Sequence, residues 1–351
     1  MSAGCNMLDA AEELLQQRRI PESIVAFRAA EAAGYDADRC AAGCWIAAML
    51  SGEFEAAWQE SDGIRRRGAA DPNRFWQGED LTGKRVIVRC LHGFGDTVQF
   101  LRYIPLLRSL ASHVIVECAP DVVELARCMK GIDEVVTWGL HAPRHRLVWD
   151  VQMELMELPY FFRSTLASLP SSDGYLKLPG GTLAKAKSAV ERCSLPRVGM
   201  VWASGDWNPS RSVKFEAIRS ILDRDDFEFW NLQGGSHREQ WLTMEPRANL
   251  RDHPMLNNAG IVPLAAFIAQ LDLVISVDTL AAHLAGTLKV PCFLMLQHAA
   301  DWRWMTGRDD SPWYPSLRLF RQPRSGDWET VVRQVDSALE GWSQATTRCV
   351  A

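Results

Sequence analysis

The sequence predicts an α/β protein with parallel sheets that follows a helical N-terminal extension. Apolar runs of strand length alternate with stretches of helical periodicity, and short turns join each strand to the next helix. Four helical patterns separated by turn residues occupy the first 75 residues. With 351 residues and 47% hydrophobic residues, the chain is long enough for two further domains with their own cores. We expect the boundaries 1–75, 82–195 and 196–345.

The N-terminal helical patterns form two similar pairs. They cover Ala10–Arg18, Pro21–Ala33, Asp38–Ser51 and Glu53–Arg67. The segment 19–27 superposes on 52–59 after a shift of 33 positions, close to the period of about 34 residues of tetratricopeptide repeats. Because a solenoid of this kind needs about three repeats, these helices either pack on the α/β part of the chain or on another subunit, or form a groove for a protein partner.

Two α/β units follow the helical extension. In the first, strands are predicted at 85–90, 113–118, 134–137 and 147–151, with helices at Val98–Leu110 and Leu183–Cys193. In the second, strands are predicted at 197–202, 228–233, 271–276 and 291–296, with a late strand at 317–322 and a terminal helix at Asp327–Trp342. Helices between successive strands make parallel sheets the expected result.

The segment Ser276–Gly286 is the most informative motif. It follows an apolar strand and opens a helix with Asp278 and Thr279, and His283 comes about one turn later. Backbone N–H groups at a helix start carry partial positive charge and lack intrahelical partners, so this turn suits a pyrophosphate. The structural alternative is that Asp278 is an ordinary N-cap and His283 a packed core residue.

A second strand-loop-helix unit lies upstream. The strand Arg85–Cys90 leads into the glycine turn His92–Thr97, which places Asp96 beyond the carboxyl end of the strand, where open α/β sheets bind ligands. The turn lacks the dinucleotide-binding fingerprint, because Val98 stands where a third glycine would be needed. Asp96 could equally serve as the N-cap of the helix that follows.

Three segments together resemble a known family. They are His92–Leu107, Ser276–Gly286, and Asp301–Trp304 with its continuation Ser311–Ser316. In this order they are similar to bacterial tetratricopeptide-repeat proteins with a heptosyltransferase-like domain of glycosyltransferase family 9. The resemblance implies a GT-B fold of two Rossmann-like domains, with the nucleotide-sugar donor on the C-terminal domain and the acceptor mainly on the N-terminal one. It also implies that no metal or other cofactor is required and that the terminal helix returns to the N-terminal domain.

The resemblance also assigns site residues. It implies that Asp96 is the catalytic base of an inverting transfer and that a cation in the loop 203–214 holds the donor pyrophosphate. Arg211 is the first choice, because a guanidinium can bind two phosphate oxygens, and Lys214 is the alternative. The expected donor residues also include Asp278, Thr279 and His283. The expected acceptor or cleft residues are His92, Gly93, Gly95, Thr97, Gln99 and Arg303. Trp302, Trp304, Trp313 and Tyr314 are expected to pack around the terminal helix.

Composition limits the remaining classes. A net charge of −5 argues against a general nucleic-acid binder. Nine scattered cysteines suggest thiols in a reducing cytoplasm, and Cys40 and Cys44 are expected to pack in the core rather than bind a metal. No transmembrane segment is expected, so the predicted location is the cytoplasm or the periphery of the inner membrane.

Three functions stay open at this stage. The first is a glycosyltransferase that moves a sugar from a nucleotide-diphosphate donor, such as an ADP-heptose, to a glycan, lipopolysaccharide or protein acceptor. The second is a non-catalytic scaffold that retains the nucleotide-sugar site. The third is a nucleotide-sugar epimerase of the same architecture, which Asp96 on the acceptor side disfavours.

Overall fold

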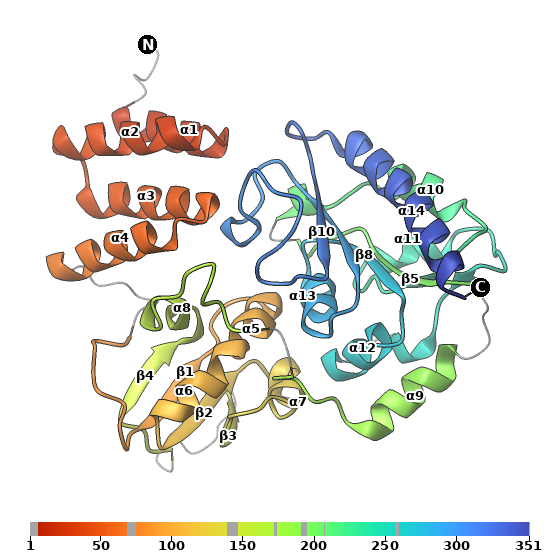
Figure 1. The fold of residues 1–351 in the computed structure, drawn as a ribbon, viewed down its shortest axis with the longest axis horizontal. Helices are drawn as coiled ribbons and strands as arrows, with labels where there is room; N and C mark the ends of the chain where they lie inside the picture. The colour runs from red at the N-terminus through yellow and green to blue at the C-terminus, as the bar shows by residue number, and fades with distance from the viewer. Residues whose placement is uncertain are drawn as a thin grey trace. The chain divides into compact units, whose positions relative to one another are not determined.

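The computed structural model describes residues 6–68, 75–138, 147–171, 174–190, 195–206, 208–256 and 260–350, with side chains up to residue 342 (Figure 1). The chain divides into two compact units. The first unit comprises Met1–Gly78, Met156–Pro170 and Ala299–Arg308, and the second comprises Glu79–Leu155, Ser171–His298 and Asp309–Ala351. The predicted strand Leu147–Val151 and the predicted helix Leu183–Cys193 both fall in the second unit, and residues 191–193 of that predicted helix lie outside the described residues.

The first unit contains the four predicted helices. They are α1 (Met7–Gln16), α2 (Ile20–Ala32), α3 (Ala37–Ser51) and α4 (Phe54–Arg67), and successive helices pack on one another in a stack (Figure 1). Phe27 and Ala47 are fully buried in their core. Cys40 and Cys44 belong to the same core, as expected, and burial raises the pKa of the Cys44 thiol to about 11.

The two helix pairs repeat the same backbone geometry. Arg18 and Gly52 both adopt positive φ angles, of 62° and 78°, just before the second helix of each pair. The next residues, Arg19 and Glu53, have φ/ψ of −83°/66° and −84°/63°. Corresponding positions are therefore 34 residues apart (19 and 53). A non-glycine residue rarely adopts positive φ, so the packing of the pair imposes this turn on Arg18.

Two later segments complete the first unit. Trp58 Nε1 donates a 2.7 Å hydrogen bond to the carbonyl of Ser164, and the ring of Trp45 meets that of Trp302 edge-on at 5.4 Å. The backbone N–H of Thr306 donates to the carbonyl of Leu50 at 2.8 Å. The helices α3 and α4 thus pack against two segments of the same unit, Met156–Pro170 and Ala299–Arg308.

The second unit begins with a four-stranded parallel sheet in the order β3-β2-β1-β4. Its strands are β1 (Arg85–Arg89), β2 (His113–Cys118), β3 (Glu134–Thr137) and β4 (Val151–Glu154). The prediction for β4 was wrong in its bounds. The strand begins only at Val151, and just before it the side chain of Asp150 accepts a 2.8 Å hydrogen bond from Arg85 N.

The helix predicted at Val98–Leu110 is three shorter segments. They are α5 (Phe94–Phe100), a 3₁₀ turn (Leu101–Tyr103) and α6 (Ile104–Leu110). Pro105 lacks a backbone N–H and therefore starts a new helix instead of continuing the old one. The predicted inward residues Phe100, Leu101, Ile104 and Leu107 are fully buried. The sheet is also covered by α7 (Val123–Ala126), whereas α8 (Leu158–Phe161) belongs to the first unit.

A six-stranded parallel sheet forms the rest of the second unit, in the order β10-β9-β8-β5-β6-β7. Its strands are β5 (Arg197–Val201), β6 (Glu228–Asn231), β7 (Leu250–Arg251), β8 (Leu273–Val277), β9 (Cys292–Leu296) and β10 (Leu317–Arg321). All but the two-residue β7 were predicted. β5 and β8 are adjacent, and both are buried on their two faces, as expected for central strands of a parallel sheet.

Helices flank the six-stranded sheet (Figure 1). They are α9 (Gly180–Val190), α10 (Phe215–Leu222), α11 (Arg238–Leu242), α12 (Ile261–Ile268), α13 (Leu280–Thr287) and α14 (Trp328–Val350). The terminal helix α14 packs on α10, β9 and β10, with Val331, Val335 and Leu339 in the core of this sheet. This packing replaces the expected return of α14 to the N-terminal sheet, because the apolar stripe of the helix is used by the sheet that precedes it.

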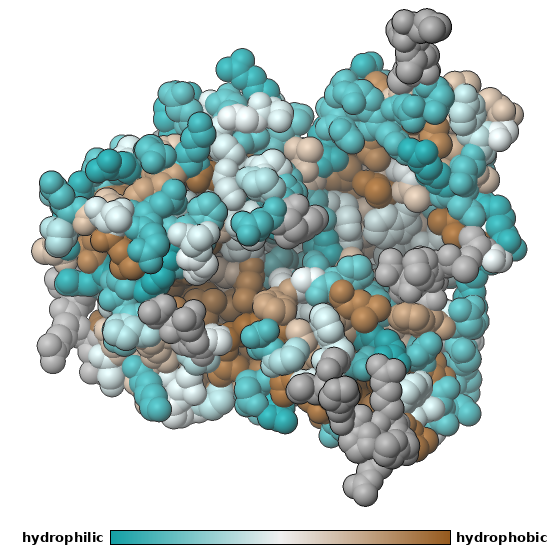
Figure 2. All heavy atoms as spheres, turned by 180° about the vertical axis from the view of Figure 1, so that it is seen from behind, coloured by the Kyte–Doolittle hydropathy of each residue, from teal (hydrophilic) through white to brown (hydrophobic). Residues whose placement is uncertain are grey.

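In the described part of the chain, no helix combines the length and the apolar character that crossing a membrane requires. Figure 2 shows one face of the molecule, on which hydrophilic side chains cover most of the surface and hydrophobic ones occur in small groups.

Candidate functional site

The starts of α5 and α13 meet in the second unit. The two helices are in contact, and the imidazole of His283 lies directly against Gly95. A β-carbon built on Gly95 would be 2.6 Å from His283 Cδ2 and 3.0 Å from Nε2. Only glycine leaves room for the ring at this position. The glycine turn after β1 and the helix start after β8 therefore lie together. The sequence predicted a ligand-binding turn at each of them but did not place the two side by side.

Asp96 lies in the first turn of α5 rather than at its N-cap. The N-cap is Gly93, whose backbone N–H donates to Asp96 Oδ2 at 3.1 Å. Thr97 is buried and its hydroxyl donates to the carbonyl of Gly93 at 3.2 Å. These two hydrogen bonds fix the turn and hold the half-buried carboxylate of Asp96 at the start of the helix, one residue after the glycine that contacts His283.

A charged cluster surrounds the start of α13. Asp278 Oδ1 lies 3.8 Å from His283 Nε2, and Asp278 Oδ2 lies 3.8 Å from Arg211 Nη1. Arg211 Nη1 also donates to the backbone carbonyl of Asp278 at 3.0 Å. The side chains of His283, Asp278 and Arg211 are only 5%, 13% and 16% exposed, so the charges of Asp278 and Arg211 interact in a partly desolvated environment. The structure thus brings three of the predicted donor residues together.

The N-cap of α13 is Thr279, not Asp278. Thr279 has extended backbone angles, and its hydroxyl lies 3.0 Å from the hydroxyl of the buried Ser276. The helix begins at Leu280, so its first backbone N–H groups point toward the Asp278–Thr279 turn. In contrast to the simplest structural alternative, Asp278 therefore does not cap the helix, and its carboxylate instead faces His283 and the guanidinium of Arg211.

Other predicted residues lie apart from this cluster. Lys214 is exposed at the N-cap of α10, whereas Arg211 ends a short 3₁₀ turn (Pro209–Arg211). His92 is exposed, and its Nε2 lies 3.6 Å from Oε1 of the buried Glu154 at the end of β4. Gln99 is fully buried in α5. These placements favour Arg211 over Lys214 as a partner of Asp278.

Arg303 belongs to the first unit. Its Nη1 donates to Asp301 Oδ1 at 2.6 Å, and its guanidinium lies 4.7 Å from the ring of Trp302. Trp304 and Trp313 are buried, and the ring of Trp313 meets that of Phe100 in α5 edge-on at 5.7 Å. The ring of Tyr314 lies against Gly286 of α13.

The sequence did not predict the roles of three residues beside the cluster, Tyr314, Arg102 and Tyr175. Tyr314 OH lies 3.1 Å from His283 Nδ1, and the guanidinium of Arg102 lies 4.6 Å from the centre of the Tyr314 ring. Tyr175 OH donates to the carbonyl of Val98 at 3.0 Å. The available signals were weak: Tyr314 sits in an aromatic segment that resembles core, and Arg102 is a cation within an otherwise apolar helix face.

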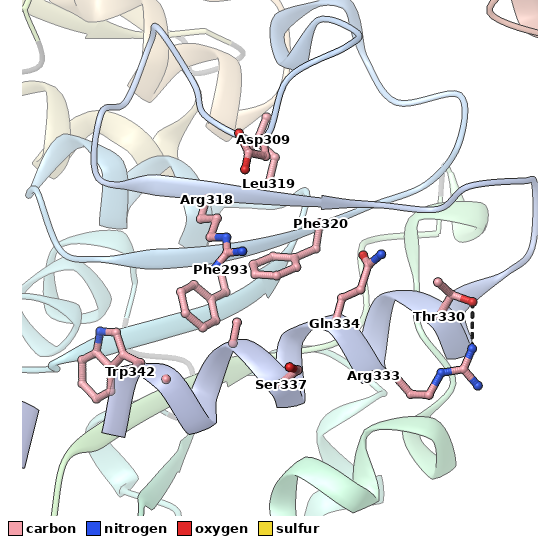
Figure 3. A pocket seen from close by; sticks show the side chains of 12 residues that line it. Phe293, Asp309, Arg318, Leu319, Phe320, Thr330, Arg333, Gln334, Ser337 and Trp342 are labelled. Atoms are coloured by element: carbon pink, nitrogen blue, oxygen red, sulfur yellow. Dashed lines mark hydrogen bonds between the residues drawn. The ribbon is translucent and has the colours of Figure 1, made fainter. Parts of the chain in front are cut away.

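A separate groove lies between α14 and strands β9 and β10 (Figure 3). It has a volume of about 820 Å³, with Phe293, Phe320 and Trp342 on its walls and Arg318 and Arg333 at its rim. Arg333 donates to the hydroxyl of Thr330 at 3.0 Å. No residue of the charged cluster lines this groove. The charged cluster, in contrast, combines a carboxylate, a guanidinium, an imidazole and a helix start.

Solved structures with a fold similar to that of this chain are glycosyltransferases. Two parallel sheets of Rossmann-like connectivity match the solved glycosyltransferase family 9 structure from Veillonella parvula DSM 2008, with a TM-score of 0.55, 14% sequence identity, and coverage of 76% of this chain and 99% of that one. The match to ADP-heptose lps heptosyltransferase II of E. coli has a TM-score of 0.55, 12% identity, and coverage of 75% and 99%. These likenesses establish the fold.

The curated relative that the chain matches is Protein FlbA of Caulobacter vibrioides. The two are 24% identical over 329 residues, which is 84% of this chain and 54% of the relative. The chain therefore spans about half the length of that relative. No family model matches the sequence.

Proposed function

We propose that the protein is a glycosyltransferase that transfers a sugar from a nucleotide-diphosphate donor with inversion at the anomeric carbon. The observation that carries the proposal is the contact of Gly95 with His283, because it places the carboxylate-bearing start of α5 beside the phosphate-type helix start of α13. The glycosyltransferase folds of the neighbouring structures support the same reading at the level of architecture.

The donor side of the proposed site is built on α13. A diphosphate would accept hydrogen bonds from backbone N–H groups at Thr279 and the residues after it, where the helix dipole favours negative charge. Arg211 would offset the charge of the leaving diphosphate, and His283 would donate to a phosphate or sugar oxygen. The proposed transfer needs no metal, because these groups can stabilise the leaving charge.

The acceptor side of the proposed site is the start of α5. Asp96 would remove the proton of an acceptor hydroxyl as its oxygen forms a bond to the anomeric carbon. The bond between that carbon and the phosphate oxygen breaks at the same time, and the diphosphate leaves with the electron pair. Attack from the face opposite the leaving group inverts the configuration. His92, Gly93 and Thr97 are proposed to shape the acceptor side.

The proposed donor, acceptor and location rest on the resemblance of the sequence motifs to glycosyltransferase family 9. We propose a sugar nucleotide such as an ADP-heptose as donor and a glycan, lipopolysaccharide or protein as acceptor. The similar turns at Arg18 and Gly52, both with positive φ and 34 residues apart, support a tetratricopeptide-like origin for the first unit. We further propose action in the cytoplasm or at the inner face of the membrane, with the GT-B domains at 82–195 and 196–345.

A ligand panel tests the proposal. Thermal unfolding would be recorded with ADP, GDP and UDP, their sugar conjugates and the matching nucleosides. A ligand present at 100 times its dissociation constant stabilises the protein by about 2.7 kcal/mol. We expect at least one diphosphate to raise the melting temperature, and its nucleoside to raise it far less. Absence of any shift with all three diphosphates would reject the donor site and leave the scaffold function.

A further inference from the structure

A buried tyrosine contacts the imidazole of the proposed donor site from behind. Tyr314 is fully buried, and its hydroxyl lies 3.1 Å from Nδ1 of His283. The ring is held under α13 at Gly286, where a β-carbon would lie only 2.4 Å from Cγ and Cδ1 of the tyrosine. The small residue in the helix thus sets how closely the phenol can approach His283.

A buried cation sets the direction of this hydrogen bond. Arg102 is 2% exposed and donates to the carbonyls of Gln99 and Trp313 at 2.8 and 2.7 Å. Its guanidinium lies 4.6 Å from the centre of the Tyr314 ring. A guanidinium only donates and offers the phenol proton no acceptor, whereas His283 Nδ1 lies within hydrogen-bond distance of the hydroxyl.

The phenol keeps its proton at all relevant pH values. Burial raises the pKa of Tyr314 well above its usual value, and this effect outweighs the opposite influence of Arg102. Nδ1 of a neutral His283 is then the acceptor, so the ring proton sits on Nε2. Nε2 is the nitrogen that lies 3.8 Å from Asp278 Oδ1 and beside Gly95.

We propose that Tyr314, supported by Arg102, is a positioning residue that holds His283 in its Nε2-protonated tautomer and so presents an N–H donor to the diphosphate oxygens of the sugar nucleotide. This inference rests on the proposed function for the identity of the ligand, but the tautomer itself does not. The network also joins the two sides of the site, since Arg102 follows Asp96 in the same helical stretch and His283 lies on α13.

The tautomer can be measured without any ligand. Long-range ¹H–¹⁵N correlation spectra of the histidine rings distinguish protonated from unprotonated ring nitrogens, and a His283→Gln variant identifies the relevant signals among the eight histidines. We expect an unprotonated Nδ1 and a protonated Nε2 in the wild type. Tyr314→Phe keeps the ring and removes the hydroxyl, and it should produce a mixture of tautomers. Tyr175→Phe removes another buried hydroxyl, which contacts Val98 and Thr287, and should leave His283 unchanged.

Binding of ADP, GDP and UDP by calorimetry supplies the second readout. The diphosphate that binds best should bind Tyr314→Phe about 2- to 10-fold more weakly, the scale of one neutral hydrogen bond, and Tyr175→Phe nearly as well as wild type. In the His283→Gln background, Tyr314→Phe should have almost no further effect. The inference is overturned if Tyr314→Phe leaves the tautomer of His283 unchanged, or if both tyrosine variants weaken binding equally. Failure of the proposed function would look different: no diphosphate binds, while the tautomer signals stay as expected.

Discussion

The imidazole of His283 is packed against the backbone of Gly95, so closely that a β-carbon on Gly95 would stand 2.6 Å from its Cδ2. This contact joins two turns that lie almost 190 positions apart in the sequence. It also has a direct consequence for substitution, because Gly95 has ordinary helical geometry and only the space around it, not its backbone angles, excludes a side chain.

Gly95→Ala should therefore displace the His283 ring and weaken diphosphate binding. Overpacking of this kind costs about 1–3 kcal/mol, which corresponds to a loss of affinity of roughly 5- to 150-fold if the ring cannot return to its place. Gly180→Ala is the matched control, since it is also a glycine in the first turn of a helix, in α9, but nothing lies within 4 Å of the added carbon. Calorimetric titration compares the two, and equal affinities would show that the contact does not matter for binding.

Asp96→Asn tests the proposed base. Asparagine retains an oxygen that can accept the hydrogen bond from Gly93 N but cannot take a proton from the acceptor hydroxyl. Turnover should fall by about 10²- to 10⁴-fold with diphosphate affinity nearly unchanged. Asp327→Asn is the control, because Asp327 accepts from Thr330 N at the start of α14, away from the site. Wild-type turnover of Asp96→Asn with a verified acceptor would contradict the assignment.

The strands and the donor turn could be predicted from the sequence because their signals are local. Buried strands such as β8 appear as continuous apolar runs, and the Asp278–Thr279 turn follows one directly. The start of α5 at Phe94 could not be located, because Gly93 and Gly95 are poor helix formers and the apolar periodicity becomes visible only from Val98. This difference moved Asp96 from an expected cap position to the first turn.

Contacts that depend on tertiary packing could not be predicted from the sequence. Tyr314 and His283 are 31 positions apart, and nothing in an aromatic segment indicates which ring reaches an imidazole. Arg102 is a buried cation, which composition alone would place on the surface. The first unit is assembled from three separate stretches, and a linear reading of helical patterns reveals only the first of them.

Asp62 provides a test of the first unit that is independent of function. Burial raises the pKa of Asp62, but hydrogen bonds from Arg163 and Tyr160 outweigh it, so the pKa lies below the ordinary 3.8. A carboxyl group with a depressed pKa stabilises the fold above its unfolded pKa, and this contribution is lost as the pH falls through the folded pKa. Asp62→Asn should lower the free energy of unfolding by about 1–2 kcal/mol at pH 7 and by less near pH 3.

Scanning calorimetry at the two pH values measures this difference. Arg163→Gln removes the main partner, which donates to Asp62 Oδ1 at 2.6 Å, and should show the same dependence on pH. A destabilisation by Asp62→Asn that is equally large at both pH values would show that lost packing, and not the charged hydrogen bonds, is responsible.

The donor side is tested by two cations of the same loop. Arg211 contacts Asp278 at the start of α13, whereas Lys214 is exposed at the N-cap of α10. Arg211→Ala should weaken binding of the diphosphate and its sugar conjugate by about 1.5–3 kcal/mol, the scale of a hydrogen bond to a charged group. The nucleoside without phosphates should bind almost as before, because Arg211 is proposed to contact only the phosphates. A site that was merely loosened by the substitution would lose affinity for the nucleoside too.

Lys214→Ala is the matched control and should bind all three ligands like the wild type. If Lys214→Ala instead weakens diphosphate binding and Arg211→Ala does not, the phosphate-binding cation is Lys214 and the pairing of Arg211 with Asp278 is only structural.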